Sequence, residues 1–383
     1  MIWFRYLILA GVILTSASGQ EFALDRIIVK LAPDISRSDF SSILDTNNYV
    51  VEKVLVRRLN IISIKLKNNQ ISPLDAIKEF RNNPFVDKAI PDTKVSRRDM
   101  PDDMQFDQQW ALHNVGQSGG TEDADIDAPE AWDIATGGIT PLGDTIVVAI
   151  VDGGMLLTHA DLTPNLWTNW GEIPGNGIDD DNNGYVDDVH GWDAYSSDGS
   201  VPSDGHGTHV AGIVGAKGNN GVYVAGVNWD VKLMPIAGSS GTTSIVLEAY
   251  GYALDQRAIY DSTDGSSGAF VVATNSSFGV NNADCSSGNY SLWNDMYDAL
   301  GQYGILSCGA TMNNNSNVDV TGDVPTGCES EYMISVTNTT RNDAKNSGAA
   351  YGATTIDLGA PGTQILSTYT GGGTSSLTGT SMA

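Results

Sequence analysis

Residues 145–151, "TIVVAIV", form an uninterrupted apolar run that ends at Asp152. A short run of this kind, rich in β-branched residues, is typical of a strand buried on both faces of a parallel sheet. Similar runs follow at 231–236, 269–277, 303–310 and 332–339, and segments with helical apolar spacing lie at 206–216, 244–257 and 291–302. This alternation predicts an α/β fold, with a mainly parallel sheet and helices on both faces. Ligands bind at the carboxyl ends of the strands in such sheets.

The region before this sheet has a pattern of its own. Strand-like runs lie at 25–32, 49–66 and 85–92, and helical patterns lie at 36–46 and 72–83. The 49–66 run is long enough for two strands, so the order is βαββαβ, a small α+β unit. Residues 93–105, "TKVSRRDMPDDMQ", are charged and contain proline, as expected for an exposed linker open to proteolysis. We therefore divide the chain into an N-terminal module with its linker, 20–98, and a larger domain, 99–383.

The first 19 residues have the pattern of a secretory signal peptide. Arg5 precedes an apolar run from Tyr6 to Leu14, and small residues follow up to Gly19. A membrane anchor is the alternative, but the run is too short to span a bilayer comfortably. We expect cleavage near Gly19 and a secreted protein, extracellular or exported across the inner membrane, with no membrane attachment in its mature form.

Charge is divided unevenly along the chain. Residues 20–98 carry 14 Lys and Arg against 10 Asp and Glu, a net charge of +4, whereas residues 99–383 carry 5 against 36, a net of −31. Phosphate backbones require clustered cations, so the acidic domain argues against nucleic acid as a partner. It is compatible with bound calcium.

The chain has three cysteines, an odd number for an exported protein. Cys308 lies in an apolar run bounded by glycines, whereas Cys285 and Cys328 lie in polar segments with the composition of loops. We expect a Cys285–Cys328 disulfide and interpret Cys308 as a small core residue.

Three segments carry chemically useful side chains. Asp152 follows the apolar strand, "SDGHGTHVAGIVGA" places His206 and His209 near the start of a helix, and "LTGTSMA" places Ser381 among small residues. Each feature alone is more often a cap, a structural histidine or a loop. Together they supply a nucleophilic serine, a base to take its proton and a carboxylate to orient that base.

The chain order Asp, His, Ser, with the motifs "HGTHVAG" and "GTSMA", resembles the subtilases, the subtilisin-like serine proteases. The resemblance extends from about Trp110 to Ala383. It implies that Asp152, His206 and Ser381 are the catalytic triad and that His209 is a structural neighbour.

The same resemblance implies further site residues. Asn313, with the Ser381 backbone N–H, would stabilise the oxyanion, and Ser277, Phe278 and Gly279 in "NSSFG" would pair with an extended peptide substrate. Two positions depart from the family: Met312 replaces the usual glycine before the asparagine, and Gly153 replaces the usual serine or threonine after the aspartate.

The stretch 175–193, "GNGIDDDNNGYVDDVHGWD", gathers hard oxygen ligands on one loop, as calcium requires. The candidate ligands are Asp179, Asp181, Asn183, Asp187 and Asp188. Bacterial subtilases have similar acidic insertions, and Asp161 resembles another calcium ligand of the family. A solvated acidic loop and a helix or turn cap are the alternatives.

We therefore interpret the chain as the precursor of a secreted, calcium-stabilised serine endopeptidase that acts on proteins or peptides as a monomer. Subtilases resembling it carry a βαββαβ pro-domain that assists folding and inhibits the enzyme, and the charge division suits this role. In the family a helix follows the nucleophile, so we expect the sequence to be incomplete after residue 383. The rival interpretations are a catalytically silent subtilase fold that binds peptides or matrix, and a calcium-dependent adhesion module.

Overall fold

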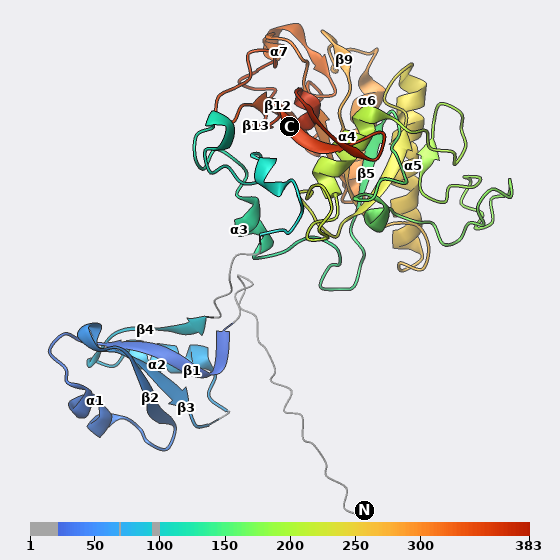
Figure 1. Cartoon of the computed structure of the whole chain (residues 1–383). Helices are drawn as coiled ribbons and strands as arrows, with labels where there is room; N and C mark the ends of the chain where they lie inside the picture. Colours follow the sequence, from blue (N-terminus) through green and yellow to red (C-terminus); the bar gives the residue numbers. More distant parts are fainter. Residues whose placement is uncertain (1–21, 69, 94–99) are drawn as a thin grey trace, which may run out of the picture. The chain divides into compact units, whose positions relative to one another are not determined.

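The computed structural model describes residues 22–68, 70–93 and 100–383 (Figure 1). The predicted signal peptide and residues 94–99 of the predicted linker lie outside the described residues. The chain divides into two compact units, Met1–Arg97 and Arg98–Ala383, and each is considered by itself. No helix in the described part of the chain is long and apolar enough to cross a membrane.

The N-terminal unit is a four-stranded antiparallel sheet with two helices. Its elements are β1 (Phe22–Leu31), α1 (Arg37–Ile43), β2 (Tyr49–Val56), β3 (Ile61–Leu66), α2 (Pro73–Arg81) and β4 (Val86–Thr93). The strand order is β2-β3-β1-β4. Alternate residues of β1, such as Ile27 and Val29, are buried with Phe40 and Phe80 of the helices. Ser36 and Ser72 cap the two helices by accepting main-chain N–H bonds. The predicted βαββαβ unit is confirmed.

The larger unit contains the parallel sheet. Its elements are α3 (Ala128–Trp132), β5 (Val147–Asp152), β6 (Trp192–Asp193), α4 (Gly205–Gly215), β7 (Lys232–Ala237), α5 (Thr243–Ser262), β8 (Val271–Ser276), β9 (Val280–Asn281), α6 (Ser291–Gln302), β10 (Leu306–Ala310), α7 (Val318–Thr321), β11 (Asp323–Val324), β12 (Met333–Thr339), β13 (Leu358–Pro361), β14 (Ile365–Tyr369) and β15 (Gly373–Leu377).

Seven strands form one sheet in the order β13-β12-β10-β8-β5-β7-β6, and every neighbouring pair is parallel. Successive side chains of a strand point to opposite faces. Val147, Ala149 and Val151 accordingly share a core with residues of α5 and α6, whereas Ile150 packs with Val210 of α4. The predicted α/β fold with helices on both faces is confirmed. By the same alternation, Asp152 lies on the face that α4 covers.

Two small antiparallel sheets flank the main one and were not predicted. β14 and β15 form a hairpin next to α4, where the Ser367 and Thr368 hydroxyls donate to main-chain oxygens of the helix. β9 pairs with β11, and a disulfide joins Cys285 to Cys328 shortly after these two strands. Cys308 is half-buried in β10 and carries no disulfide.

Candidate active site

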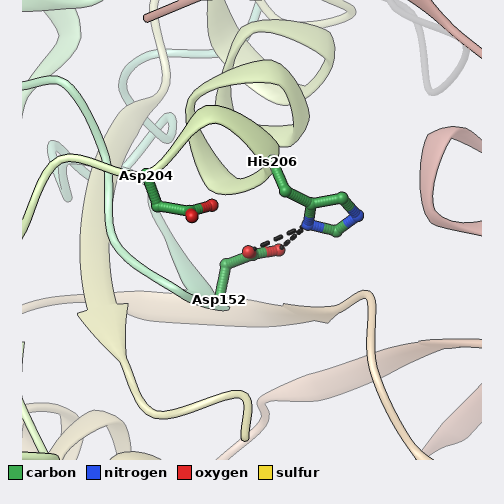
Figure 2. Close-up of side chains that lie close together, drawn as sticks. All are labelled: Asp152, Asp204 and His206. Carbon is green, nitrogen blue, oxygen red and sulfur yellow. Dashed lines mark hydrogen bonds and ion pairs between the residues drawn. The ribbon is translucent and has the colours of Figure 1, made fainter.

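Asp152 and His206 form a close carboxylate–imidazole pair at the carboxyl end of β5. The His206 Nδ1 atom lies 2.9 Å from each of the two Asp152 carboxylate oxygens (Figure 2). The Gly153 N–H donates to Asp152 Oδ1 at 2.7 Å, which fixes the rotation of the carboxylate. Asp152 is only 2% exposed. A buried carboxylate facing Nδ1 holds the proton on that nitrogen and leaves Nε2 free to act as a base.

The start of α4 brings His206 to this position. Asp204 caps the helix by accepting the Gly207 N–H at 2.8 Å. A Cβ atom at Gly207 would lie 2.0 Å from the Gly154 main-chain oxygen and 3.0 Å from Asp152 Cβ. Glycine is therefore required at position 207, because any side chain there would prevent α4 from approaching the end of β5 this closely.

Two carboxylates act on the imidazole. The hydrogen bond that His206 donates to Asp152 is the largest cause that raises the pKa of His206 above its usual value, burial opposes it, and the negative charge of Asp204 adds to the increase. One ligand atom each of Asp152, Asp204 and His206 lies within 4.8 Å of the others (Figure 2). The site therefore stabilises a positively charged imidazolium, the form that a base reaches after taking a proton.

Asp204 also accounts for one of the two departures from the family pattern. A Cβ atom at Gly153 would lie 2.9 Å from the Asp204 carboxylate carbon and 3.2 Å from both of its oxygens. A serine or threonine at 153 would therefore crowd this carboxylate.

Ser381 lies in a short 3-10 turn, Thr380–Met382, against the end of β8. Its hydroxyl donates to the Ser277 main-chain oxygen at 3.4 Å, and the Ser277 hydroxyl donates to the Ser381 main-chain oxygen at 3.1 Å. The hydrogen bonds of the described residues include none between Ser381 and His206. The structure therefore pairs Asp152 with His206 and places Ser381 beside the predicted substrate strand.

Asn313 follows β10 and contacts the residue before Ser381. Its Oδ1 accepts the Thr380 N–H at 2.9 Å, and no described group accepts a hydrogen bond from its Nδ2. The amide protons therefore remain available to an oxygen anion near Ser381. The neighbouring Met312 is buried in a small cluster with Val318 and Ala350. This packing explains how methionine is accommodated where the family has glycine.

The predicted substrate strand continues from β8. The Phe278 ring packs between Tyr250 and Trp293, at centroid distances of 6.3 and 6.4 Å. A Cβ atom at Gly279 would lie 2.2 Å from the Val324 main-chain oxygen, so this position is restricted to glycine. The phenylalanine side chain anchors the segment, while Ser277 and Gly279 flank the site with their main chain.

His209 lies one turn after His206 and is fully buried. Its Nε2 lies 3.0 Å from the main-chain oxygens of both Ile365 and Ser375. Burial lowers the pKa of His209 to about 4. The neutral His209 imidazole thus connects α4 to the hairpin of β14 and β15.

The acidic loop contains a group of oxygen ligands that the sequence indicates only in part. One carboxylate oxygen each of Glu172, Asp179 and Asp181 lies within 4.8 Å of the others, a separation suited to holding a metal ion. Asn183 lies in the same loop and donates to Asp181. Glu172 was missed because it precedes the acidic run by seven residues, and only the fold of the loop brings it back.

The two later aspartates of the loop have other partners. Asp187 accepts the N–H groups of Asn176 and Gly177 at 3.1 and 2.9 Å. Asp188 is fully buried and accepts from Tyr252 and Gln256 of α5 at 2.8 and 2.9 Å. Burial raises the pKa of Asp188 to about 6. Asp188 thus links the loop to the helix.

Asp161 lies in a second acidic site together with Asp103, which the sequence did not single out. Asp161 is fully buried and accepts the Val224 N–H at 3.0 Å and the Asn220 amide at 3.2 Å. Asp103 is 5% exposed, accepts the Asn219 N–H at 2.7 Å, and has one buried oxygen, Oδ1, without a hydrogen-bond partner. Burial raises the pKa of both carboxyl groups. An orphaned buried carboxylate oxygen beside a second carboxylate fits a cation.

The fold and this site define a class: a parallel α/β protein with a carboxylate–imidazole pair at the carboxyl end of a central strand. Comparison with known proteins agrees, because residues 143–383 match the Subtilase family. The chain belongs to this family.

Individual relatives have the same character. The chain is 31% identical over 331 residues to an extracellular protease of Xanthomonas campestris pv. campestris, covering 80% of this chain and 51% of that protein. It is 31% identical over 264 residues to thermitase of Thermoactinomyces vulgaris, covering 67% of this chain and 75% of thermitase. A solved protease structure from Pseudoalteromonas arctica superposes with a TM-score of 0.53 at 26% identity, covering 74% of this chain and 84% of that one.

The chain is 30% identical over 291 residues to the cell wall-associated protease of Bacillus subtilis, covering 75% of this chain. It spans about half the length of the Xanthomonas protein and 27% of the length of the Bacillus protein.

Proposed function

We propose that the protein is a secreted serine endopeptidase that cleaves peptide bonds through an acyl-enzyme on Ser381. The observation that carries the proposal is the buried Asp152 carboxylate held 2.9 Å from His206 Nδ1 in a chain of the Subtilase family. An endopeptidase of this class requires a base whose reactive nitrogen is free, and the pair provides it.

The residues support a complete reaction cycle. The Ser381 oxygen attacks the carbonyl carbon of the substrate while its proton passes to His206 Nε2, and Asp152 stabilises the imidazolium. The Asn313 amide and the Ser381 N–H bind the oxyanion. The carbon–nitrogen bond then breaks, and the amine leaves with the proton from His206. Water next attacks the acyl-enzyme in the same way, with His206 taking its proton, and the bond to the Ser381 oxygen breaks to release the acid. Residues 277–279 hold the substrate by pairing with it as an added strand.

Labelling with a fluorophosphonate tests this function, because the probe reacts only with an activated serine. We expect the natural protein to be labelled at Ser381 and to hydrolyse casein, and we expect the Ser381→Ala variant to do neither. Labelling at another residue, or casein hydrolysis by the alanine variant, would refute the assignment.

A catalytically silent peptide-binding subtilase is the second candidate. It is favoured by one observation, that the Ser381 hydroxyl donates to Ser277 and not to His206. Catalytic hydrogen bonds often tighten only once substrate is bound, so the proposed protease is compatible with this geometry. A folded natural protein that binds peptides but resists the probe would establish this second function.

The relatives named extracellular and cell wall-associated proteases support secretion, as does the composition of residues 1–19. We further propose that residues 20–98 act as an inhibitory pro-domain that is removed by the enzyme itself, and that the mature protease is a monomer. The charges of +4 and −31 favour association of the module with the protease domain, more weakly at high salt. Full-length Ser381→Ala protein should remain uncut between Val95 and Gln109, and normal processing would indicate a separate protease.

We also propose that calcium stabilises the protease domain. The support is a set of oxygen donors at Glu172, Asp179 and Asp181, and the unpartnered buried oxygen of Asp103 beside Asp161. Bound calcium would neutralise these carboxylates and join the segments that carry them. Asp187 and Asp188 remain predicted ligands, and their contacts above also suit a purely structural role.

A further inference from the structure

A cavity of about 190 Å³ opens directly beside Ser381 and Asn313. Its walls are formed by the substrate strand at Phe278 and Gly279 on one side and by the segment after β10 on the other. In the substrate residue whose carbonyl is attacked at Ser381, the side chain is attached to the Cα atom next to that carbonyl. A substrate that paired with residues 277–279 would direct this side chain toward the cavity.

Asp323 is one of the residues that line the cavity. Asp323 is 1% exposed, and its Oδ2 accepts hydrogen bonds from the hydroxyls of Thr326 at 2.6 Å and Thr311 at 3.0 Å. These two hydroxyl donors favour the ionised form, but burial is the larger effect and raises the pKa of Asp323.

The position of Asp323 is fixed by the fold. Asp323 is the first residue of β11 and pairs with Asn281 of β9 in the small antiparallel sheet. The Cys285–Cys328 disulfide joins the two chain segments just beyond these strands. The Thr311 hydroxyl donates to Asp323, and the Thr311 main-chain oxygen accepts a hydrogen bond from the Thr380 hydroxyl at 2.5 Å. The carboxylate is thus connected rigidly to the residue that precedes the nucleophile.

Nothing among the described residues neutralises this charge. Among the described residues, no lysine, arginine or histidine forms an ion pair with Asp323, and none is among the main influences on its pKa. A buried charge without a counterion is costly unless a partner supplies the opposite charge. The domain from residue 99 onward, with its net charge of −31, also attracts cations at long range.

We propose that Asp323 determines specificity, so that the protein cleaves after residues with a positively charged side chain, arginine or lysine. This inference rests on the proposed protease function and adds the substrate class. The positive group of the substrate enters the cavity and compensates the Asp323 carboxylate, whereas an acidic side chain is excluded by repulsion.

The test compares two peptide amides that differ only before the scissile bond, one with arginine and one with citrulline, its neutral isostere. For the natural protein we expect kcat/KM to be at least about tenfold higher for arginine. The Asp323→Asn variant should bring the ratio close to one, whereas Asp295→Asn, which removes an exposed charge on α6, should keep the natural ratio.

The outcomes separate the two claims. Equal rates for arginine and citrulline in natural protein that reacts with the fluorophosphonate would overturn the specificity and leave the protease function intact. Absence of both labelling and hydrolysis would overturn the protease function and the specificity with it. If Asp323→Asn fails to fold, the ratio measured with the natural protein decides alone.

Discussion

Replacing Asp152 by asparagine should remove most of the activity while leaving the fold intact. The Gly153 N–H donates to Oδ1 at 2.7 Å, so it would retain the asparagine carbonyl at that position. The asparagine NH2 group would then occupy the Oδ2 position, 2.9 Å from His206 Nδ1. An NH2 group there donates to Nδ1 and moves the ring proton to Nε2, the nitrogen that must accept the serine proton.

The wrong tautomer should lower kcat by about 10⁴-fold, the effect of the equivalent change in a known serine protease, or about 5 kcal/mol of transition-state stabilisation. The assay is peptide hydrolysis from pH 5 to pH 9, with thermal unfolding as a check on the fold. Asp295→Asn, an exposed position on α6, is the matched control.

The same variant should also change the pH dependence. Catalysis requires neutral His206, and the hydrogen bond that His206 donates to Asp152 raises the pKa of this histidine above 6.5. Activity of the natural protein should therefore fall as the pH drops through this raised value, and the acid limb of the variant should lie at lower pH. A folded Asp152→Asn protein with kcat within tenfold of natural, or with an unmoved acid limb, would refute the reasoning.

Three further predictions follow from individual contacts. Asp204→Asn preserves the helix cap but removes a charge that raises the pKa of His206, so the acid limb of kcat/KM should move to lower pH, and an unmoved limb would argue against this electrostatic role. Chelating calcium should lower the melting temperature of the natural protein by about 5–10 °C, as expected for a ligand present at about 100 times its Kd. In the Asp103→Asn variant the chelator should cause a smaller shift. Equal shifts in the natural protein and the variant would exclude Asp103 as a ligand. Replacing Cys285 and Cys328 by serine opens a loop with a sequence separation of 43, which should lower the free energy of unfolding by about 4 kcal/mol, and a loss below about 1 kcal/mol in urea unfolding would contradict this.

The sequence predicted the parts of the molecule that depend on local pattern. The β5 run identified a strand buried on both faces, and the spacing of "HGTHVAG" placed His206 on a helix. Both inferences need only the period of the apolar residues and the flanking glycines. The short strands β9 and β11 have two residues each, too few to produce a detectable period.

Site residues that depend on long-range packing could not be predicted. Asp103 resembles any other acid in a charged linker, and its significance appears only where residues 219–224 fold against it and Asp161. Asp323 is separated from Asp152 by most of the domain and lies in a glycine-rich polar segment without a motif. Burial distinguishes such residues from solvated acids, and burial is a property of the folded chain.

The sheet order explains why the proposed catalytic parts converge. β5, β8 and β10 are adjacent, and their carboxyl ends lead to Asp152, to the 277–279 segment and to Asn313. Neighbouring strands lie about 4.8 Å apart. Three consecutive strands therefore place the Asp152–His206 pair, the substrate strand and the oxyanion donor Asn313 within about 10 Å of one another along one edge of the sheet. Asp323 joins this edge from a separate small sheet, through Thr311 just after β10. Because the specificity cavity and the oxyanion donor are both built on the segment that follows β10, a change in this segment should alter substrate preference and catalytic rate together.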